Sequence, residues 1–253
     1  MNKTMNSYNP YTLEGKTILI TGSSAGIGRA TAIECSKLGA KVVLVARNED
    51  RLKSVLKELE GDGHLYITCD LTSSEGVTLM VDNLPSLDGV VLNAGVSILS
   101  PISFLKEEDL DATLSLNTKS PIITLQRIVK KKKIQKNSSV VFTSSIAGLG
   151  AAAVGEAAYM ASKGAISAFV KGAALELSRK GIRVNAVCPG MVQTEMTDAY
   201  GIDEANNPDL ANYPLGRYGQ PKDIAHAIIY LLSDASSWVT GSNLIIDGGL
   251  TIK

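Results

Sequence analysis

The sequence has little cysteine, few aromatic residues, no excess of either charge and no long apolar run. Its three cysteines, in a chain of 253 residues, include no C-x-x-C pair, which argues against a disulfide scaffold or a thiolate zinc site. The 25 Lys and Arg residues balance 25 Asp and Glu residues, so bulk attraction to nucleic acid or an anionic membrane is not expected. No run of about 18 apolar residues predicts a membrane-spanning helix. We therefore expect no metal, nucleic-acid or membrane partner.

The N-terminal residues are polar and lack the apolar core of a secretory signal. Residues 1–12 are predicted to form a flexible N-terminal extension. Because an odd number of unpaired cysteines favours a reducing compartment, we expect the protein to be cytoplasmic.

Two kinds of segment alternate through the rest of the chain. Short apolar runs typical of strands covered on both faces occur at 17–21, 41–46, 64–70, 89–95, 139–145, 182–190 and 243–249. The segments between these runs contain signals of helix ends. Asn48 and Pro221 are typical of a helix start, and Gly39 and Gly181 are typical of a helix end. The alternation predicts a doubly wound α/β fold with seven mostly parallel strands and helices on both faces. Residues 13–253 are predicted to form a single domain, with a substrate lid at about 191–213.

The first predicted strand runs directly into a glycine-rich turn. Gly22, Gly26 and Gly28 give the spacing G-x-x-x-G-x-G before a predicted helix. Glycines at this place allow a tight turn and let the backbone approach a pyrophosphate at the helix N-terminus. The spacing differs from the common dinucleotide fingerprint G-x-G-x-x-G, so the alternative is a turn without a ligand. Its position on the first strand favours dinucleotide binding.

The end of the second strand bears on the choice of dinucleotide. A carboxylate there would bind the ribose 2′-hydroxyl of NAD(H), whereas an arginine would pair with the 2′-phosphate of NADP(H). The sequence has Arg47 and no acid at this place. We predict NADP(H) rather than NAD(H); the alternative is that Arg47 faces solvent at the start of the next helix.

Tyr159 and Lys163 form a Y-x-x-x-K pair whose spacing puts both side chains on one face of a predicted helix. An ammonium stabilises a phenolate, so Lys163 would lower the tyrosine pKa toward the range that a general acid needs. Taken alone, the pattern fits an ordinary amphipathic helix equally well.

The other motifs of the chain favour the catalytic interpretation of Tyr159 and Lys163. The chain contains TGSSAGIG (21–28), LNAG (92–95), SSIAG (144–148), YMASK (159–163) and PGMVQT (189–194), with Asp70 and Asn117 between them. In this order they resemble the short-chain dehydrogenase/reductase family, and the chain is similar to its 3-oxoacyl-carrier-protein reductase-like subgroup. The resemblance covers Leu13 to Lys253 and implies a Rossmann-type fold. The sequence departs from the family in having Leu92 instead of a first asparagine and one extra residue between Ser145 and Tyr159.

The resemblance implies roles for individual residues. Ser145 would bind the substrate oxygen, Tyr159 would exchange the proton, Lys163 would bind the nicotinamide ribose and lower the Tyr159 pKa. Asn117 would hold a water in the proton relay to Lys163. Asp70 would contact the adenine ring. The full set of expected cofactor contacts is Gly22, Ser24, Gly26, Ile27, Gly28, Arg47, Asp70, Leu71, Asn93, Ala94, Gly95, Tyr159, Lys163, Pro189, Gly190, Val192 and Thr194.

The resemblance also implies an activity, which is the reversible NADP(H)-dependent reduction of a ketone to a secondary alcohol. The leading substrate is a 3-oxoacyl thioester or similar small carbonyl compound. A neutral sugar, a polyol or a hydroxysteroid is the alternative. A non-catalytic NADP(H)-binding regulatory module is the alternative of another class.

Two further features, a segment of small residues and the single tryptophan, also lead to predictions. The segment 157–174 is rich in Ala and Gly nearly all round its predicted helix. The matching helix in the family forms a two-fold interface, so a homodimer or homotetramer is expected. Trp238, the only tryptophan, is expected to anchor the last loop by packing.

Overall fold

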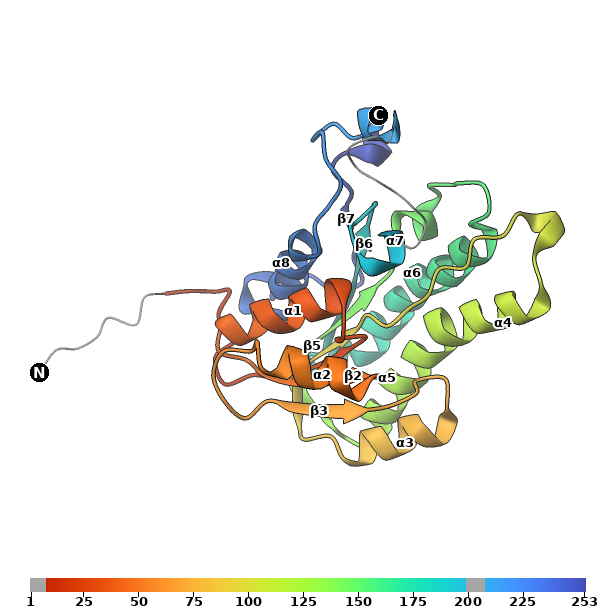
Figure 1. Cartoon of the computed structure of the whole chain (residues 1–253). Helices are drawn as coiled ribbons and strands as arrows, with labels where there is room; N and C mark the ends of the chain where they lie inside the picture. Colours follow the sequence, from red (N-terminus) through yellow and green to blue (C-terminus); the bar gives the residue numbers. More distant parts are fainter. Residues whose placement is uncertain (1–7, 199–207) are drawn as a thin grey trace, which may run out of the picture.

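Seven parallel strands form one sheet in the computed structural model, which describes residues 8–198 and 208–253 (Figure 1). The order across the sheet is β3-β2-β1-β4-β5-β6-β7, and every pairing is parallel. The strands are β1 (Thr17–Thr21), β2 (Lys41–Ala46), β3 (Leu65–Thr68), β4 (Leu87–Leu92), β5 (Ile134–Thr143), β6 (Arg183–Pro189) and β7 (Asn243–Ile246). The predicted α/β fold with a parallel, doubly wound sheet is confirmed.

Both faces of the sheet are covered by helices, as the near-continuous apolar strands require. Ile18 and Ile20 of β1 face one cluster with α1 (Gly26–Lys37), α2 (Glu49–Leu56) and α8 (Pro221–Leu232). Leu19, between them, faces the other cluster with α3 (Ser74–Asp82), α5 (Ser120–Lys130) and α6 (Ala157–Leu177). Figure 1 shows α1 and α8 side by side, away from α5 and α6. Alternate strand residues therefore enter opposite halves of the core.

The helix ends agree with the signals in the sequence. The Asn48 side chain accepts a hydrogen bond from the Arg51 N–H and caps α2, and Pro221 is the first residue of α8. Gly39 and Gly181 have φ values of +85° and +70°, the left-handed conformation that ends a helix. The other helices are α4 (Glu107–Leu114), which continues into a π-helical turn at Ser115–Lys119, and α7 (Glu195–Asp198).

Several predicted strands were wrong at their carboxyl ends. Residues 69–70, 93–95, 144–145 and 247–249 lie beyond the sheet, although the sequence analysis placed them in strands. Asp70 and Asp247 accept hydrogen bonds from backbone N–H groups two residues further on, and Ser145 does the same for Ala147. Such side-chain bonds compete with the strand ladder and turn the chain out of the sheet. Most of these residues line the cavity described below.

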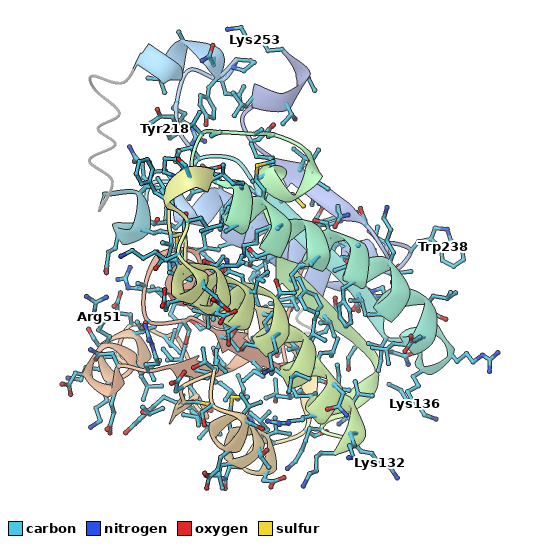
Figure 2. All side chains as sticks on the ribbon, turned by 90° about the vertical axis from the view of Figure 1, so that its right-hand side faces the viewer. Arg51, Lys132, Lys136, Tyr218, Trp238 and Lys253 are labelled. Carbon is cyan, nitrogen blue, oxygen red and sulfur yellow. The ribbon has the colours of Figure 1, made fainter. Side chains whose placement is uncertain are left out.

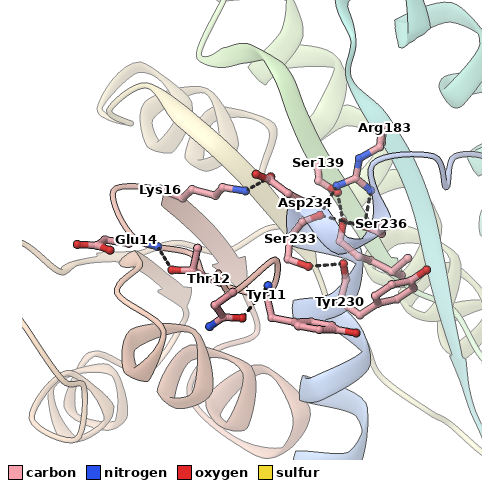
Figure 3. A network of polar contacts seen from close by, with 12 residues as sticks. Tyr11, Thr12, Glu14, Lys16, Ser139, Arg183, Tyr230, Ser233, Asp234 and Ser236 are labelled. Carbon is pink, nitrogen blue, oxygen red and sulfur yellow. Dashed lines mark hydrogen bonds and ion pairs between the residues drawn. The ribbon is translucent and has the colours of Figure 1, made fainter. Parts of the chain in front are cut away.

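The first residues that the structure describes are bonded to the short segment that follows α8 (Figure 3). The Ala235 N–H donates to the Pro10 carbonyl oxygen, and Lys16 forms an ion pair with Asp234 at 2.7 Å. Arg183 binds the Ser233 carbonyl oxygen and the Ser236 hydroxyl in the same region. Residues 1–7 of the expected extension lie outside the described residues, and the domain boundary at residue 12 stays a prediction.

Trp238 does not anchor a loop. Its side chain is 99% exposed and projects from the surface in Figure 2, so the expected packing role was wrong. Backbone hydrogen bonds hold this loop instead. The Val239 N–H donates to the Ser236 carbonyl oxygen, and the Gly241 N–H donates to the Val184 carbonyl oxygen of β6.

Within residues 8–198 and 208–253, no helix is long and apolar enough to cross a membrane. The same residues hold no cluster of three His, Cys, Asp or Glu side chains suited to a metal. The three cysteines are free and buried, and burial raises the pKa of Cys188 to about 11, which makes it a poor nucleophile.

Candidate active site

A cavity of about 810 Å³ opens at the carboxyl ends of six strands. Its lining comes mainly from the segments that follow β1, β2, β3, β4, β5 and β6, and from the first half of α6. β1 and β4 are neighbours in the sheet, and the chain winds outward from them in opposite directions. Open α/β sheets bind ligands at such a switch point.

The glycine turn forms the floor of one end of this cavity. Gly22 has φ +67°, and a Cβ there would lie 2.8 Å from the Ala94 Cα. A Cβ at Gly28 would overlap the Gly22 carbonyl oxygen, so α1 packs against the turn only because this residue is glycine. No side chain caps α1, and no acid lies in its first turn. Its first N–H groups are thus suited to an anion, and the cradle fits a pyrophosphate.

Asn93 joins the ends of three strands beside this turn. Its Nδ2 donates to the carbonyl oxygens of Thr21 and Gly22, while its Oδ1 accepts from the Thr143 hydroxyl at 3.1 Å. The Thr21 hydroxyl in turn accepts from the Asn93 and Ala94 N–H groups. Leu92, where the family has another asparagine, is buried in the core. The network holds the glycine turn in place without it.

Charged side chains line the outer end of the cavity. Arg47 follows β2 directly, and no acid of β2 or α2 lines the cavity beside it. The nearest acid on α2, Glu49, is bonded to Lys53 and the Tyr66 hydroxyl. The N–H and hydroxyl of Thr72 bond Asp70 and, with Arg47 nearby, hold the pKa of that carboxyl below its usual value.

Arg51 and Glu195 meet across the mouth of the cavity at 2.7 Å. Arg51 lies on α2, at the edge of the molecule in Figure 2, and Glu195 begins α7. The part of the expected lid that the structure describes is therefore tied to α2 by an ion pair. Residues 199–207 of that lid lie outside the described residues.

Tyr159 and Lys163 line the inner end of the cavity from α6. The Lys163 Nζ lies 5.7 Å from the centre of the Tyr159 ring and donates to the Thr143 carbonyl oxygen at 2.8 Å. Lys163 is buried and forms no ion pair with a carboxylate of residues 8–198 or 208–253, and desolvation lowers its pKa to about 8. A cation this close to the phenol favours the phenolate, as expected from the spacing.

Ser145 stands opposite α6, just beyond β5. Its hydroxyl accepts a hydrogen bond from the Ala147 N–H at 3.1 Å and lines the same cavity. The hydroxyl of its neighbour Ser144 donates to the Lys163 carbonyl oxygen of α6. Gly148 fits against α6 at this point because a Cβ would lie 2.6 Å from the Lys163 carbonyl carbon. Ser145 and Tyr159 therefore both line this one cavity.

Asn117 lies behind the cavity lining rather than in it. Its Oδ1 accepts from the Val96 N–H and its Nδ2 donates to the Val96 carbonyl, both at 2.8 Å. A Cβ at Gly95 would lie 3.2 Å from the Asn117 Oδ1 and 3.4 Å from the Lys163 Nζ. The asparagine and the lysine therefore approach the same glycine. The π-helical turn that carries Asn117 is a deformation often found at functional sites.

All but two of the residues singled out from the sequence line this cavity. The exceptions are Gly28, under the glycine turn, and Asn117. The others are Gly22, Ser24, Gly26, Ile27, Arg47, Asp70, Leu71, Asn93, Ala94, Gly95, Ser145, Tyr159, Lys163, Pro189, Gly190, Val192 and Thr194. Sequence reasoning missed Arg51 and Glu156, whereas Glu195 lies within the lid expected at about 191–213. Glu156 had a signal, because it lies three residues before Tyr159 on the same helical face.

Comparison with known proteins agrees with this geometry. The family model described as enoyl-(acyl carrier protein) reductase matches residues 22–251. The 3-oxoacyl-(acyl-carrier-protein) reductase of Rickettsia bellii is 36% identical over 238 residues, which are 94% of this chain and 98% of that protein. The enzyme of the same name from Thermotoga maritima is 38% identical over 246 residues, 95% of this chain and 99% of the relative.

Solved structures of two other proteins are also similar to this chain. A short-chain type dehydrogenase/reductase from Mycobacterium marinum superposes with a TM-score of 0.88 at 32% identity, over 96% of this chain and 98% of that one. A putative 2-deoxy-d-gluconate 3-dehydrogenase from Agrobacterium tumefaciens, with bound NADP, gives 0.86 at 31% identity, over 97% and 100%. The chain therefore belongs to the short-chain dehydrogenase/reductase family and is an oxidoreductase.

Proposed function

We propose that this protein reduces a ketone to a secondary alcohol with NADPH, reversibly, and that its substrate is a 3-oxoacyl thioester or a similar small carbonyl compound. The observation that carries the proposal is the placement of the Tyr159 phenol, with the Lys163 ammonium behind it, at the inner end of the same cavity that holds a pyrophosphate cradle. The names of its 3-oxoacyl-(acyl-carrier-protein) reductase relatives support the substrate class.

The residues present fit NADP(H). Gly22, Gly28 and the uncapped start of α1 suit the pyrophosphate. Arg47 suits a 2′-phosphate, and within the described residues no carboxylate of β2 or α2 lines the cavity beside it. The bound dinucleotide would supply the hydride, which is chemistry that no side chain can provide.

The side chains would supply orientation and the proton. Ser145 and Tyr159 would each donate a hydrogen bond to the substrate carbonyl oxygen, where negative charge grows during reduction. Tyr159 would then give up its hydroxyl proton to that oxygen. The buried Lys163 ammonium would stabilise the phenolate left behind. Asn117 would keep the Val96 backbone, and with it Gly95, in position beside Lys163.

Replacing Arg47 by Ala should raise the dissociation constant of NADPH about 10- to 100-fold while changing that of NADH little. A charge-assisted hydrogen bond contributes about 1.5–3 kcal/mol, and only NADPH has the 2′-phosphate. Fluorescence titration with both dinucleotides measures the effect. The matched control is Lys53→Ala, which removes a cation from α2 outside the cavity and should change neither constant. Equal weakening of both dinucleotides would contradict the proposal.

The substrate class is tested by NADPH oxidation across a carbonyl panel. The panel holds an acetoacetyl thioester, ketosteroids, keto-sugars and small diketones. Turnover of the thioester above the others supports the proposal, whereas preference for a keto-sugar or ketosteroid supports the alternative dehydrogenase. Tight NADPH binding with no turnover of any member would favour a regulatory module.

We also propose that the protein is a homodimer or homotetramer that works in the cytoplasm. One face of α6 exposes only small residues at helical spacing, Ala157, Ala161, Ala165, Ala168 and Gly172. Small side chains let a second helix approach closely. Sedimentation of the purified chain should therefore give a mass of two or four times 26.7 kDa, and a monomer would refute the assembly.

A further inference from the structure

Glu156 is a cavity-lining carboxylate that the proposed mechanism does not use. It is the residue just before α6, yet its side chain forms no capping hydrogen bond. No hydrogen bond or ion pair joins its carboxylate to the residues that the structure describes, although its own N–H donates to the Ala153 carbonyl. The side chain is half-buried, and burial raises the pKa of the carboxyl.

Glu156, Tyr159 and Lys163 share one face of α6. Along the helix axis Glu156 lies about 4.5 Å from Tyr159 and about 10 Å from Lys163, at 1.5 Å per residue. The Lys163 ammonium is bonded to the Thr143 carbonyl oxygen. No ion pair joins it to Glu156 within the described residues, so the Glu156 carboxylate lies about one helical turn from Tyr159 without a bound cation.

The other charged lining residues lie at the opposite end of the cavity. Arg47 lies near Asp70, and Arg51 is paired with Glu195, at the ends of β2 and β3 and the starts of α2 and α7. Next to Glu156 the chain packs on an uncharged segment, because a Cβ at Gly155 would lie 3.8 Å from the Leu99 Cβ. The Ser100 N–H bonds the Gly155 carbonyl at 2.9 Å, which holds this wall together just before Glu156.

We propose that Glu156 selects substrate by charge: the site accepts a ketone whose neighbouring group is neutral, such as a 3-oxo ester or thioester, and rejects the free 3-oxo acid. This inference rests on the proposed function, because it concerns the substrate of the same site. A ketone hydrogen-bonded to Tyr159 would place its substituents near Glu156, which lies about one helical turn away. A carboxylate there would meet a like charge inside a partly desolvated cavity, at about 6 Å, which disfavours binding about 10- to 100-fold.

The test compares acetoacetate with ethyl acetoacetate at pH 8, each with saturating NADPH. We expect wild type to prefer the ester, and Glu156→Gln to raise the ratio of kcat/KM for acetoacetate over the ester about 10- to 100-fold. Glu156→Asp keeps the charge and should keep most of the preference. A structural role would move both substrates alike, so an unchanged ratio in Glu156→Gln would overturn the inference.

A second readout does not need turnover. Acetoacetate binding to the NADPH complex is followed by quenching of NADPH fluorescence, and should tighten in Glu156→Gln by a similar factor. Equal binding in both proteins would overturn the inference. Tighter binding in the variant, without reduction of either compound by wild type, would support the charge selection and contradict the proposed function alone.

Discussion

Tyr159→Phe should lower kcat about 10²- to 10⁴-fold while the dissociation constant of NADPH stays close to that of wild type. The substitution removes only the hydroxyl, and with it the proton that the carbonyl oxygen needs, which is the usual contribution of a general acid. The ring that lies 5.7 Å from the Lys163 Nζ is kept, so the cavity wall is preserved. Steady-state kinetics on an acetoacetyl thioester, with a fluorescence titration of NADPH, measure the two effects.

Tyr66→Phe is the matched control for this variant. The Tyr66 hydroxyl binds Glu49 outside the cavity, so its loss should leave kcat unchanged. If Tyr159→Phe kept most of its turnover, another group would be the proton donor and the assignment would be wrong.

Lys163→Met should make the protein more stable and less active. Burial lowers the pKa of Lys163 from 10.5 to about 8, so keeping the ammonium charged at pH 7 costs about 3 kcal/mol of folding free energy. The variant loses the hydrogen bond to the Thr143 carbonyl, which offsets about 1 kcal/mol of that gain. We therefore expect the free energy of unfolding to rise by about 1–2 kcal/mol at pH 7, while kcat falls about 10²-fold or more.

The stability gained in Lys163→Met should depend on pH in one direction. Because the folded-state pKa lies below the unfolded value, the penalty is complete below about pH 8 and disappears as the pH rises toward 10.5. The difference in urea unfolding between variant and wild type should shrink over that range. Lys57→Met, at an exposed position at the end of α2, is the control and should change neither stability nor activity. A variant less stable than wild type at pH 7 would contradict the account.

Much of this molecule was predictable from local patterns. The apolar runs and the helix-end signals at Asn48, Gly39 and Pro221 gave the alternation of strands and helices. A parallel sheet then brings the carboxyl ends of its strands to one edge, so Gly22, Arg47, Asn93 and Ser145 had to converge. Periodicity could not show where the strands stop, because Asp70 and Ser145 end them by bonding nearby N–H groups.

Other features depend on partners that lie far away in the sequence. Arg51 meets Glu195 only through the fold, 144 residues apart. The Lys163 pKa depends on burial and on the distant Cys188 of β6, not on its neighbours in the sequence. Trp238 was misjudged because apolar size alone predicted packing, whereas the loop is held by its own backbone. Glu156 could be placed near Tyr159 by helical spacing, but only the structure shows that it has no partner among the described residues.

The central claim is that hydride from NADPH reaches a substrate carbonyl carbon inside this cavity. Transfer of deuterium to the product from NADPH that carries deuterium at both C4 positions tests it most directly. After incubation with an acetoacetyl thioester, mass spectrometry should find one deuterium at C3 of the 3-hydroxyacyl product with wild type, and almost no product with Tyr159→Phe. NADPH consumption that leaves the 3-hydroxyacyl product unlabelled would contradict the account.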